Sequence, residues 1–305
     1  MVYALVIVSL VILSIALLFA YQSAKYSLKQ GWHILVLSLA LVVFAYLYGT
    51  WVFLTIYIKY AIPVSYLLAL WLGTRKSVTK TVRKWKAIPN LLFTIVLGTF
   101  CVLYFTGTVD DRDTVEIAFP LKKGRYFVFQ GGKGLPTNFF HYSYRGAVFA
   151  IDLVKLDAYG NRANKVFSKT LEDYHIFNDT VFSPCNGIIE TMHDDNPDNI
   201  PPNRERGPSN TNMLVIDGGS YFVFMGHLKH LGVFVKEGDS VKIGQPLALA
   251  GNSGFSIEPH LHIQAHAKPS NGEGWYKGKP LLIKFDGRSY LLFETITPRK
   301  VEMVQ

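Results

Sequence analysis

The sequence has 305 residues, of which 50% are hydrophobic, and a formal net charge of +9. Residues 1–107 hold nine Lys and Arg but no Asp or Glu, whereas residues 108–305 hold equal numbers of basic and acidic residues. Excess positive charge confined to an apolar region is typical of a membrane protein, so we expect a lipid bilayer and no nucleic acid as a partner.

Four apolar stretches in the N-terminal region predict transmembrane helices. They cover residues 2–20, 33–50, 52–73 and 91–105. A helix of about 20 apolar residues crosses roughly 30 Å of hydrocarbon. The first stretch lacks the basic leading region and clear cleavage site of a signal peptide, so we expect a retained span. A kink at Lys59 would reduce the count to three spans.

Basic residues orient this N-terminal bundle. Six of them lie between residues 75 and 86, which predicts a cytoplasmic loop, and Lys25 and Lys29 mark a second one. The last span then leaves the cytoplasm. We therefore predict a multi-pass protein of the cell membrane, with an α-helical transmembrane anchor at 1–107 and an extracytoplasmic domain at 108–305.

The second domain has a different pattern. Short runs of Val, Ile, Phe and Tyr alternate with Gly, Pro, Asn and Asp, which predicts a mainly-β, antiparallel-sheet domain. The expected strands are 115–119, 125–129, 147–154, 187–192, 213–217, 221–228, 233–235, 246–250, 261–265, 280–285 and 290–293. The polar stretch 193–212 is long for a loop in a compact domain, and such loops are commonly functional or disordered.

The segment 259–263 reads Pro-His-Leu-His-Ile. On a strand, His260 and His262 would emerge side by side on one face, with Leu261 directed into the core. The turn chemistry of residues 251–254 and Pro259 favour a strand over a helix. Two neutral imidazoles on one face make half of a zinc site, or one ligand beside one catalytic base. Two surface histidines on an edge strand are the alternative.

Two other polar residues interrupt apolar runs. Asp152 lies within the expected strand 147–154, where a buried carboxylate needs a partner such as a cation. A capping or bulge role is the alternative for Asp152. Strand alternation places His227 on the same face as Val223 and Met225, and a lone histidine of this kind is more often a core residue than a catalyst.

Together these segments resemble the lysostaphin-type zinc metallopeptidases, which cut peptidoglycan peptides. The similar segments are 181–187, 212–217, Gly226-His227-Leu228, 235–247, 251–254 and 259–262. The run 235–247 alone also resembles biotinyl and lipoyl carrier domains, but it has no lysine at a hairpin tip. The resemblance covers about residues 120–268, and the ordered string from His227 to His262 is its most specific part.

The resemblance implies one Zn²⁺ per chain, held by His141, Asp152 and His262, with His227 and His260 as the catalytic pair. In the commonest first motif of the family, the two ligands are four residues apart, whereas His141 and Asp152 are eleven apart. Three protein ligands leave zinc one position for water, whose pKa falls to roughly 7. One histidine of the pair would take the water proton, and the other would stabilise the oxyanion or protonate the leaving amine.

The leading hypothesis is therefore a membrane-anchored zinc metalloendopeptidase that hydrolyses peptide bonds in peptidoglycan cross-links or stem peptides. The alternative is a catalytically inactive module of the same fold that binds cell wall or activates another hydrolase. The unusual spacing of His141 supports that alternative. A third hypothesis is a peptidase for a protein outside the wall, such as a bacteriocin.

Overall fold

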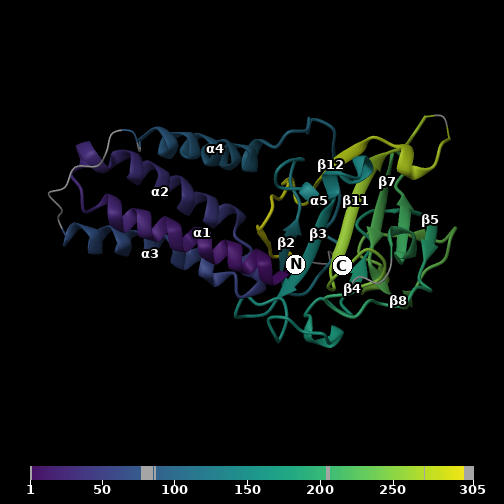
Figure 1. Ribbon diagram of the computed structural model, residues 1–305. Coiled ribbons are helices and arrows are strands. Elements are labelled where there is room, and N and C mark those ends of the chain that lie inside the picture. The colour runs from purple at the N-terminus through teal and green to yellow at the C-terminus, as the bar shows by residue number, and fades with distance from the viewer. Residues whose placement is uncertain (1, 77–84, 86, 204–206, 271, 299–305) are drawn as a thin grey trace. The chain divides into compact units, whose positions relative to one another are not determined.

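The computed structural model describes residues 2–76, 85, 87–203, 207–270 and 272–298 (Figure 1). The chain divides into two compact units. The first unit contains Met1–Tyr104 with Tyr159–Asn161, and the second contains Phe105–Ala158 with Arg162–Gln305.

The first unit consists of apolar helices. They are α1 (Val2–Ser23), α2 (Leu28–Tyr48), the short turn η1 (Trp51–Phe53), α3 (Tyr57–Thr74) and α4 (Ala87–Thr106). Within the described residues, three of these helices are long and apolar enough to cross a membrane, namely α1, α2 and α4. This confirms the predicted set of N-terminal apolar helices, with three rather than four qualifying as spans. Helix α3 contains Lys59 and Pro63 and does not qualify.

The predicted cytoplasmic loop falls largely on residues 77–84 and 86, which lie outside the described residues. Among the helices that are described, α1, α2 and α3 lie side by side (Figure 1). Small residues permit this close packing. Ala16 and Ala20 of α1 are fully buried, and a Cβ atom added at Gly73 of α3 would lie 2.3 Å from the backbone oxygen of Tyr21.

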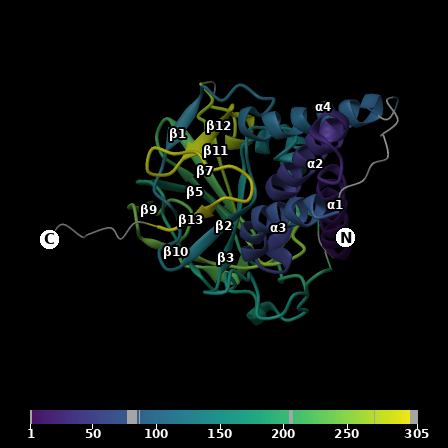
Figure 2. The same ribbon diagram turned by 90° about the vertical axis from the view of Figure 1, so that its left-hand side faces the viewer.

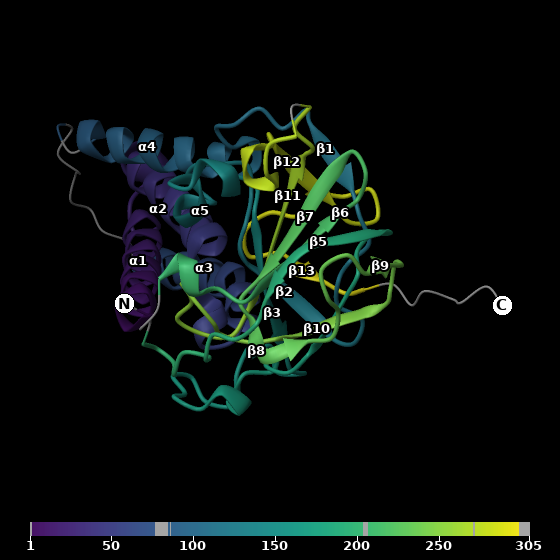
Figure 3. The same cartoon turned by 90° about the vertical axis from the view of Figure 1, so that its right-hand side faces the viewer.

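The second unit is built around one large sheet. Its strands run in the order β13 (Thr295–Ile296), β2 (Arg125–Gln130), β3 (Ile151–Leu156), β11 (Leu261–Ala267), β7 (Tyr221–Gly226), β6 (Met213–Asp217), β5 (Gly187–His193) and β9 (Ser240–Val241). Adjacent strands on this path are antiparallel, which confirms the predicted fold class. Figure 3 shows β11, β7, β6 and β5 side by side.

Two further groups of strands complete the second unit. Strand β12 (Pro280–Lys284) pairs with β11, and β1 (Thr114–Glu116) pairs with β12 in parallel (Figure 2). A three-stranded sheet holds β4 (Thr180–Phe182), β10 (Pro246–Ala250) and β8 (Leu228–Val233). The main core lies in this unit, and its apolar side chains come from both sheets.

The alternation predicted for the histidine strand is present in β11. Leu261 and Ile263 are fully buried in the core beside Val223 and Met225 of β7, so His262 emerges on the opposite face.

Several expected strands differ from the structure. Strand β1 ends at Glu116 rather than at residue 119, the expected strand 221–228 is broken at His227, and only Val233 of the expected strand 233–235 lies in a strand. Strand β3 begins at Ile151 because residues Arg145–Ala147 form a 3-10 turn, and residues 290–293 form no strand.

Candidate metal centre and catalytic pair

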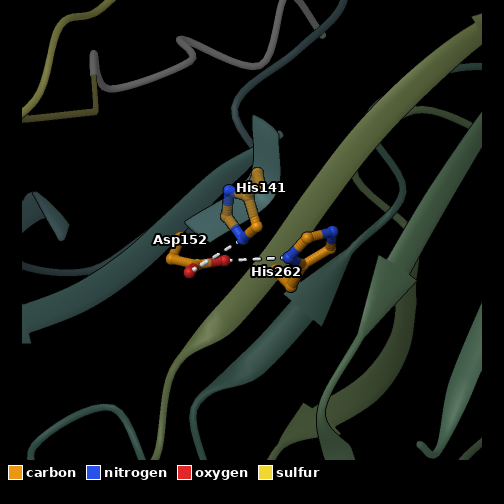
Figure 4. A group of neighbouring side chains, drawn as sticks. All are labelled: His141, Asp152 and His262. Carbon is orange, nitrogen blue, oxygen red and sulfur yellow. Dashed lines mark hydrogen bonds and ion pairs between the residues drawn. The ribbon is translucent and has the colours of Figure 1, made fainter. Parts of the chain in front are cut away.

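The two central strands bring Asp152 and His262 together. Strands β3 and β11 are antiparallel neighbours, and their register places His262 directly opposite Asp152. His141 comes from the short helix α5 (Phe139–Tyr142), which precedes β3. The side chains of these three residues point toward one another in Figure 4. The three residues that the sequence resemblance assigned to zinc are therefore neighbours in space.

The donor atoms lie at distances that suit a small cation. His141 Nε2 is 3.2 Å from one carboxylate oxygen of Asp152, and His262 Nδ1 is 2.9 Å from the other. Within the described residues, the three ligand atoms form a group whose members all lie within 4.8 Å of one another. A tetrahedral zinc with ligand distances of about 2.1 Å separates its donors by about 3.4 Å. The spacing thus fits a zinc ion with only small movements.

Asn138 fixes the protonation of His141. Its side-chain NH₂ donates to the backbone oxygens of Val148 and Ala150, each at 3.0 Å, so its carbonyl oxygen is left as an acceptor. That oxygen lies 2.9 Å from His141 Nδ1, which must carry the proton. The lone pair on His141 Nε2 therefore faces the Asp152 carboxylate.

A hydrogen-bonded relay fixes the protonation of His262 in the same way. His266 Nδ1 donates to the Gly278 oxygen at 3.0 Å, so His266 Nε2 accepts from the Gln264 NH₂ at 3.1 Å. The Gln264 oxygen then accepts from His262 Nε2 at 3.1 Å. The lone pair on His262 Nδ1 consequently faces the Asp152 carboxylate as well.

These two relays leave three electron-rich groups facing one another without a proton between them. Asp152 is almost completely buried. Burial alone would raise the pKa of Asp152, but the adjacent His141 and His260 hold it well below its usual range, so this carboxyl is charged. A buried carboxylate and two imidazole lone pairs match the ligand set of a catalytic zinc site, and a cation would remove their mutual repulsion.

Without a metal, only protons bound by the neighbouring histidines can compensate the negative charge of Asp152. Burial alone would lower the pKa of His141, but the Asp152 carboxylate raises it above the usual value. Burial lowers the pKa of His262, and the neighbouring Asp152 carboxylate offsets only part of that effect. The carboxylate thus attracts positive charge to a position that a metal ion can fill.

His227 and His260 lie beside this group. Their ring centroids are 4.5 Å apart, and the His227 ring is 5.7 Å from that of His262. His227 Nδ1 donates to the Ser253 oxygen and His260 Nδ1 to the Glu258 oxygen, each at 2.8 Å. Both rings therefore present Nε2 for proton transfer, and His260 Nε2 lies 3.6 Å from Asp152. All five residues singled out from the sequence meet in one place.

The expectation that His227 shares the face of Val223 and Met225 was wrong. Those residues lie in the core, whereas the ring of His227 lies with His260 and His262 on the opposite face. Strand β7 ends at Gly226, and His227 adopts a left-handed backbone conformation with φ of 61°. This uncommon conformation ends the strand alternation and turns the ring toward the site.

The polar loop 193–212 supports the turn that orients His227 and His260. The Asn199 side chain donates to the backbone oxygens of Gly254 and Ser256, and Asp198 accepts from the Asn252 backbone N–H at 2.6 Å. The same turn supplies the Ser253 oxygen that binds His227. The described part of this loop is therefore hydrogen-bonded to the site.

Sequence reasoning missed several residues that orient the rings, among them Asn138, Gln264 and Ser253. One signal was available for Gln264, because it lies two residues after His262 on a strand and so shares its face. Asn138 could not be recognised in this way, because its contacts with residues 148 and 150 are made by an irregular segment.

Replacing Gln264 with Ala should weaken zinc binding by about 10–100-fold, because His262 loses the acceptor that orients its ring. Gln264→Glu keeps an acceptor at that position and should bind more tightly than Gln264→Ala. Titration of the metal-free protein with zinc measures both values. Gln245→Ala is the control, because the Gln245 side chain accepts from the turn N–H of Lys242 rather than from a residue of the site. Equal affinity in Gln264→Ala and the wild type would contradict the orienting role.

A buried ion pair holds the entry to β11. Arg162 Nε and Nη2 donate to the two carboxylate oxygens of Glu258 at 2.8 and 2.9 Å, and both side chains are almost fully buried. The backbone oxygen of Glu258 binds His260. The ion pair therefore ties the segment containing Arg162 to the position of His260.

Replacing Arg162 with Met should destabilise the protein by about 3–5 kcal/mol and lower its melting temperature by roughly 6–20 °C, because the Glu258 charge stays buried without its partner. The double variant Arg162→Met/Glu258→Leu should be more stable than Arg162→Met. Arg288→Met is the control, since its ion pair with Glu294 is exposed and should contribute little. Thermal unfolding of the full chain in detergent measures the relative stabilities of the three variants.

One protein-family profile matches part of the second unit. Residues 173–274 match the profile of peptidase family M23. The matched segment contains His227, His260 and His262, whereas His141 and Asp152 precede it. The second unit is thus an antiparallel-sheet domain that contains a match to peptidase family M23, and the resemblance to lysostaphin-type metallopeptidases is confirmed.

Two curated relatives are described as uncharacterized metalloproteases. One, from Buchnera aphidicola, is 35% identical over 86 residues, which is 28% of this chain and 22% of the relative. The other, from Haemophilus influenzae, is 30% identical over 109 residues, 36% of this chain and 19% of the relative. The chain thus spans about a fifth of the length of either relative.

Among solved structures, the catalytic domain of the antimicrobial peptidase lysostaphin from Staphylococcus simulans is similar to this chain. It is 20% identical, the match covers 48% of this chain and 83% of that chain, and the TM-score is 0.27.

Proposed function

We propose that this chain is a membrane-anchored zinc metalloendopeptidase that hydrolyses peptide bonds in peptidoglycan cross-links or stem peptides. The observation that carries the proposal is the orientation of two imidazole lone pairs, on His141 and His262, toward the buried carboxylate of Asp152. The match to peptidase family M23 supports the reaction type.

Each of the three proposed ligand residues offers one donor atom to the metal. His141 would bind through Nε2, His262 through Nδ1 and Asp152 through its carboxylate. When bound, zinc supplies a Lewis acid that polarises the peptide carbonyl and lowers the pKa of water to roughly 7. Asn138 and Gln264 keep the rings of the two histidines in the tautomers that this binding needs.

The catalytic pair moves the protons. Burial lowers the pKa of His227 well below its usual value, and the neighbouring His260 and His262 lower it further, so its ring is neutral at neutral pH. One histidine takes the proton of the attacking water at Nε2. The other donates to the oxyanion that forms on the peptide carbonyl, or protonates the leaving amine. Their ring centroids are 4.5 Å apart, so both reach one substrate group.

The placement in the cell is part of the proposal. Three apolar helices support membrane anchoring, and the Lys and Arg pattern supports an extracytoplasmic catalytic domain at residues 108–305. Both curated relatives come from bacteria, and a catalytic domain outside a bacterial membrane would meet peptidoglycan, which is therefore the first substrate to test.

The test uses the purified full chain in detergent. Elemental analysis should give about one zinc per chain, and digestion of purified peptidoglycan should release new amino groups until a chelator is added. Well-folded protein without zinc would favour the inactive, wall-binding module. Zinc-loaded protein that cleaves a protein substrate but leaves peptidoglycan intact would favour the peptidase for a protein outside the wall.

A further inference from the structure

An aromatic surface adjoins the candidate metal centre. Phe139, Phe140 and Tyr142 of α5 and the nearby Tyr144 are exposed by 65%, 49%, 41% and 50%. We call these four residues the α5 aromatic patch. His141 lies between Phe140 and Tyr142 in α5, so one residue of the candidate metal centre shares a helical turn with three of the four patch residues. Exposed apolar clusters of this kind mark interaction surfaces.

The patch lies close to the point where the chain leaves α4. Helix α4 ends at Thr106, and Thr108 then forms two hydrogen bonds of 2.9 Å with the loop before α5. The Thr108 N–H donates to the Lys133 oxygen, and the Thr108 hydroxyl oxygen accepts from the Leu135 N–H. The Asn138 N–H binds the Gly134 oxygen and leads directly into α5. All these contacts lie within the second unit. The patch is therefore only a few residues and hydrogen bonds away from the end of a candidate span.

The surrounding charges do not oppose contact with lipid. Residues 134–144, which contain the whole patch, include no Lys, Arg, Asp or Glu. The acidic residues that follow α4 are paired. Asp110 binds Arg112, Asp111 binds Lys133 and Asp113 binds Lys279. Burying the patch at a membrane surface would thus desolvate aromatic rings rather than unpaired charges.

From these observations we propose that the α5 aromatic patch inserts into the interfacial layer of the bilayer. The Phe rings contact the acyl boundary and the Tyr rings keep their hydroxyls among the headgroups, as in aromatic belts of membrane proteins. The site containing His141 is then held at the membrane surface. Resting on the proposed peptidase function, this restricts the substrate to peptide bonds close to the membrane.

Spin labelling of the full chain in phosphatidylcholine nanodiscs tests the proposal. One nitroxide is attached at Phe140→Cys and one at the control position Ile243→Cys, both in a Cys101→Ala background, while the buried Cys185 stays unlabelled. Ile243 is exposed and follows β9, the last strand at the far edge of the sheet. Both are surface substitutions, so the fold should be retained, and circular dichroism checks this.

The label at residue 140 should collide more often with oxygen than with a water-soluble nickel chelate, and the label at residue 243 should show the reverse. Equal nickel accessibility at both positions would overturn the proposal. Protection of residue 140 that appears only when peptide substrate is added would also overturn it, and would assign the patch to substrate binding. The labels report how deeply a residue lies in the bilayer, and this readout does not require hydrolysis. The same accessibility difference is therefore expected in a His262→Ala background, so the membrane proposal can be tested even if the proposed catalytic activity is wrong.

Discussion

Zinc content should fall to background in a His262→Ala variant, and peptide hydrolysis should fall below detection. The substitution removes the Nδ1 donor that faces Asp152 at 2.9 Å and leaves only two protein ligands. Structural and catalytic zinc sites both need at least three protein ligands, so the remaining pair should not retain the ion. Elemental analysis and peptidoglycan digestion of the full chain measure both effects.

Thermal unfolding provides a readout of the same variant that does not depend on catalysis. Zinc at about 100 times its dissociation constant stabilises a protein that binds it only in the folded state by about 2.7 kcal/mol. Added zinc should therefore raise the melting temperature of the wild type but not that of His262→Ala. His230→Ala is the control, because His230 is exposed and should leave zinc binding unchanged. Full activity in His262→Ala would exclude the proposed ligand set.

Replacing His227 should separate catalysis from metal binding. The variant should keep its zinc but lose about 10²–10⁴-fold in kcat/KM, because a positioned proton-transfer group contributes about that much. The ring lies 4.5 Å from that of His260 and is oriented by the Ser253 oxygen rather than by a metal ligand. Hydrolysis rates and zinc content measured on one preparation test both halves of this expectation.

The backbone at His227 requires a matched variant. With φ of 61°, an Ala at this position is strained, whereas Asn adopts the left-handed conformation readily. His227→Asn should therefore fold as the wild type, retain zinc and still show the catalytic loss. If His227→Asn were fully active while His227→Ala were not, the loss in the latter would reflect backbone strain, and His227 would not belong to the catalytic pair.

Local patterns were sufficient for much of the fold. Apolar stretches predicted the N-terminal helices, and alternation predicted β6 and β10 with the bounds that the structure shows. Alternation also predicted that His262 and Leu261 face opposite sides of β11. These features depend on residues within a few positions of one another, because the periods of helices and strands are set by the backbone itself.

The prediction failed where the backbone departs from a regular period. His227 was expected on the core face because the alternation of β7 was extended beyond Gly226, where the strand ends. The start of β3 was placed at residue 147, although a 3-10 turn occupies residues 145–147. Single left-handed residues and short turns leave no periodic signal, so their effect on side-chain direction is visible only in the folded chain.

The sequence by itself determined that this protein has an apolar, positively charged N-terminal region and a mainly-β domain, and its resemblance to lysostaphin-type metallopeptidases predicted which histidines and aspartate form the site. Only the tertiary structure decided how those residues meet. Asp152 and His262 are 110 residues apart and become neighbours through the register of β3 and β11. Asn138, Gln264 and His266 then fix which ring nitrogens carry protons. The physical reason is that strand pairing and buried hydrogen bonds join distant parts of the chain, and a residue's own neighbours in sequence carry no record of them.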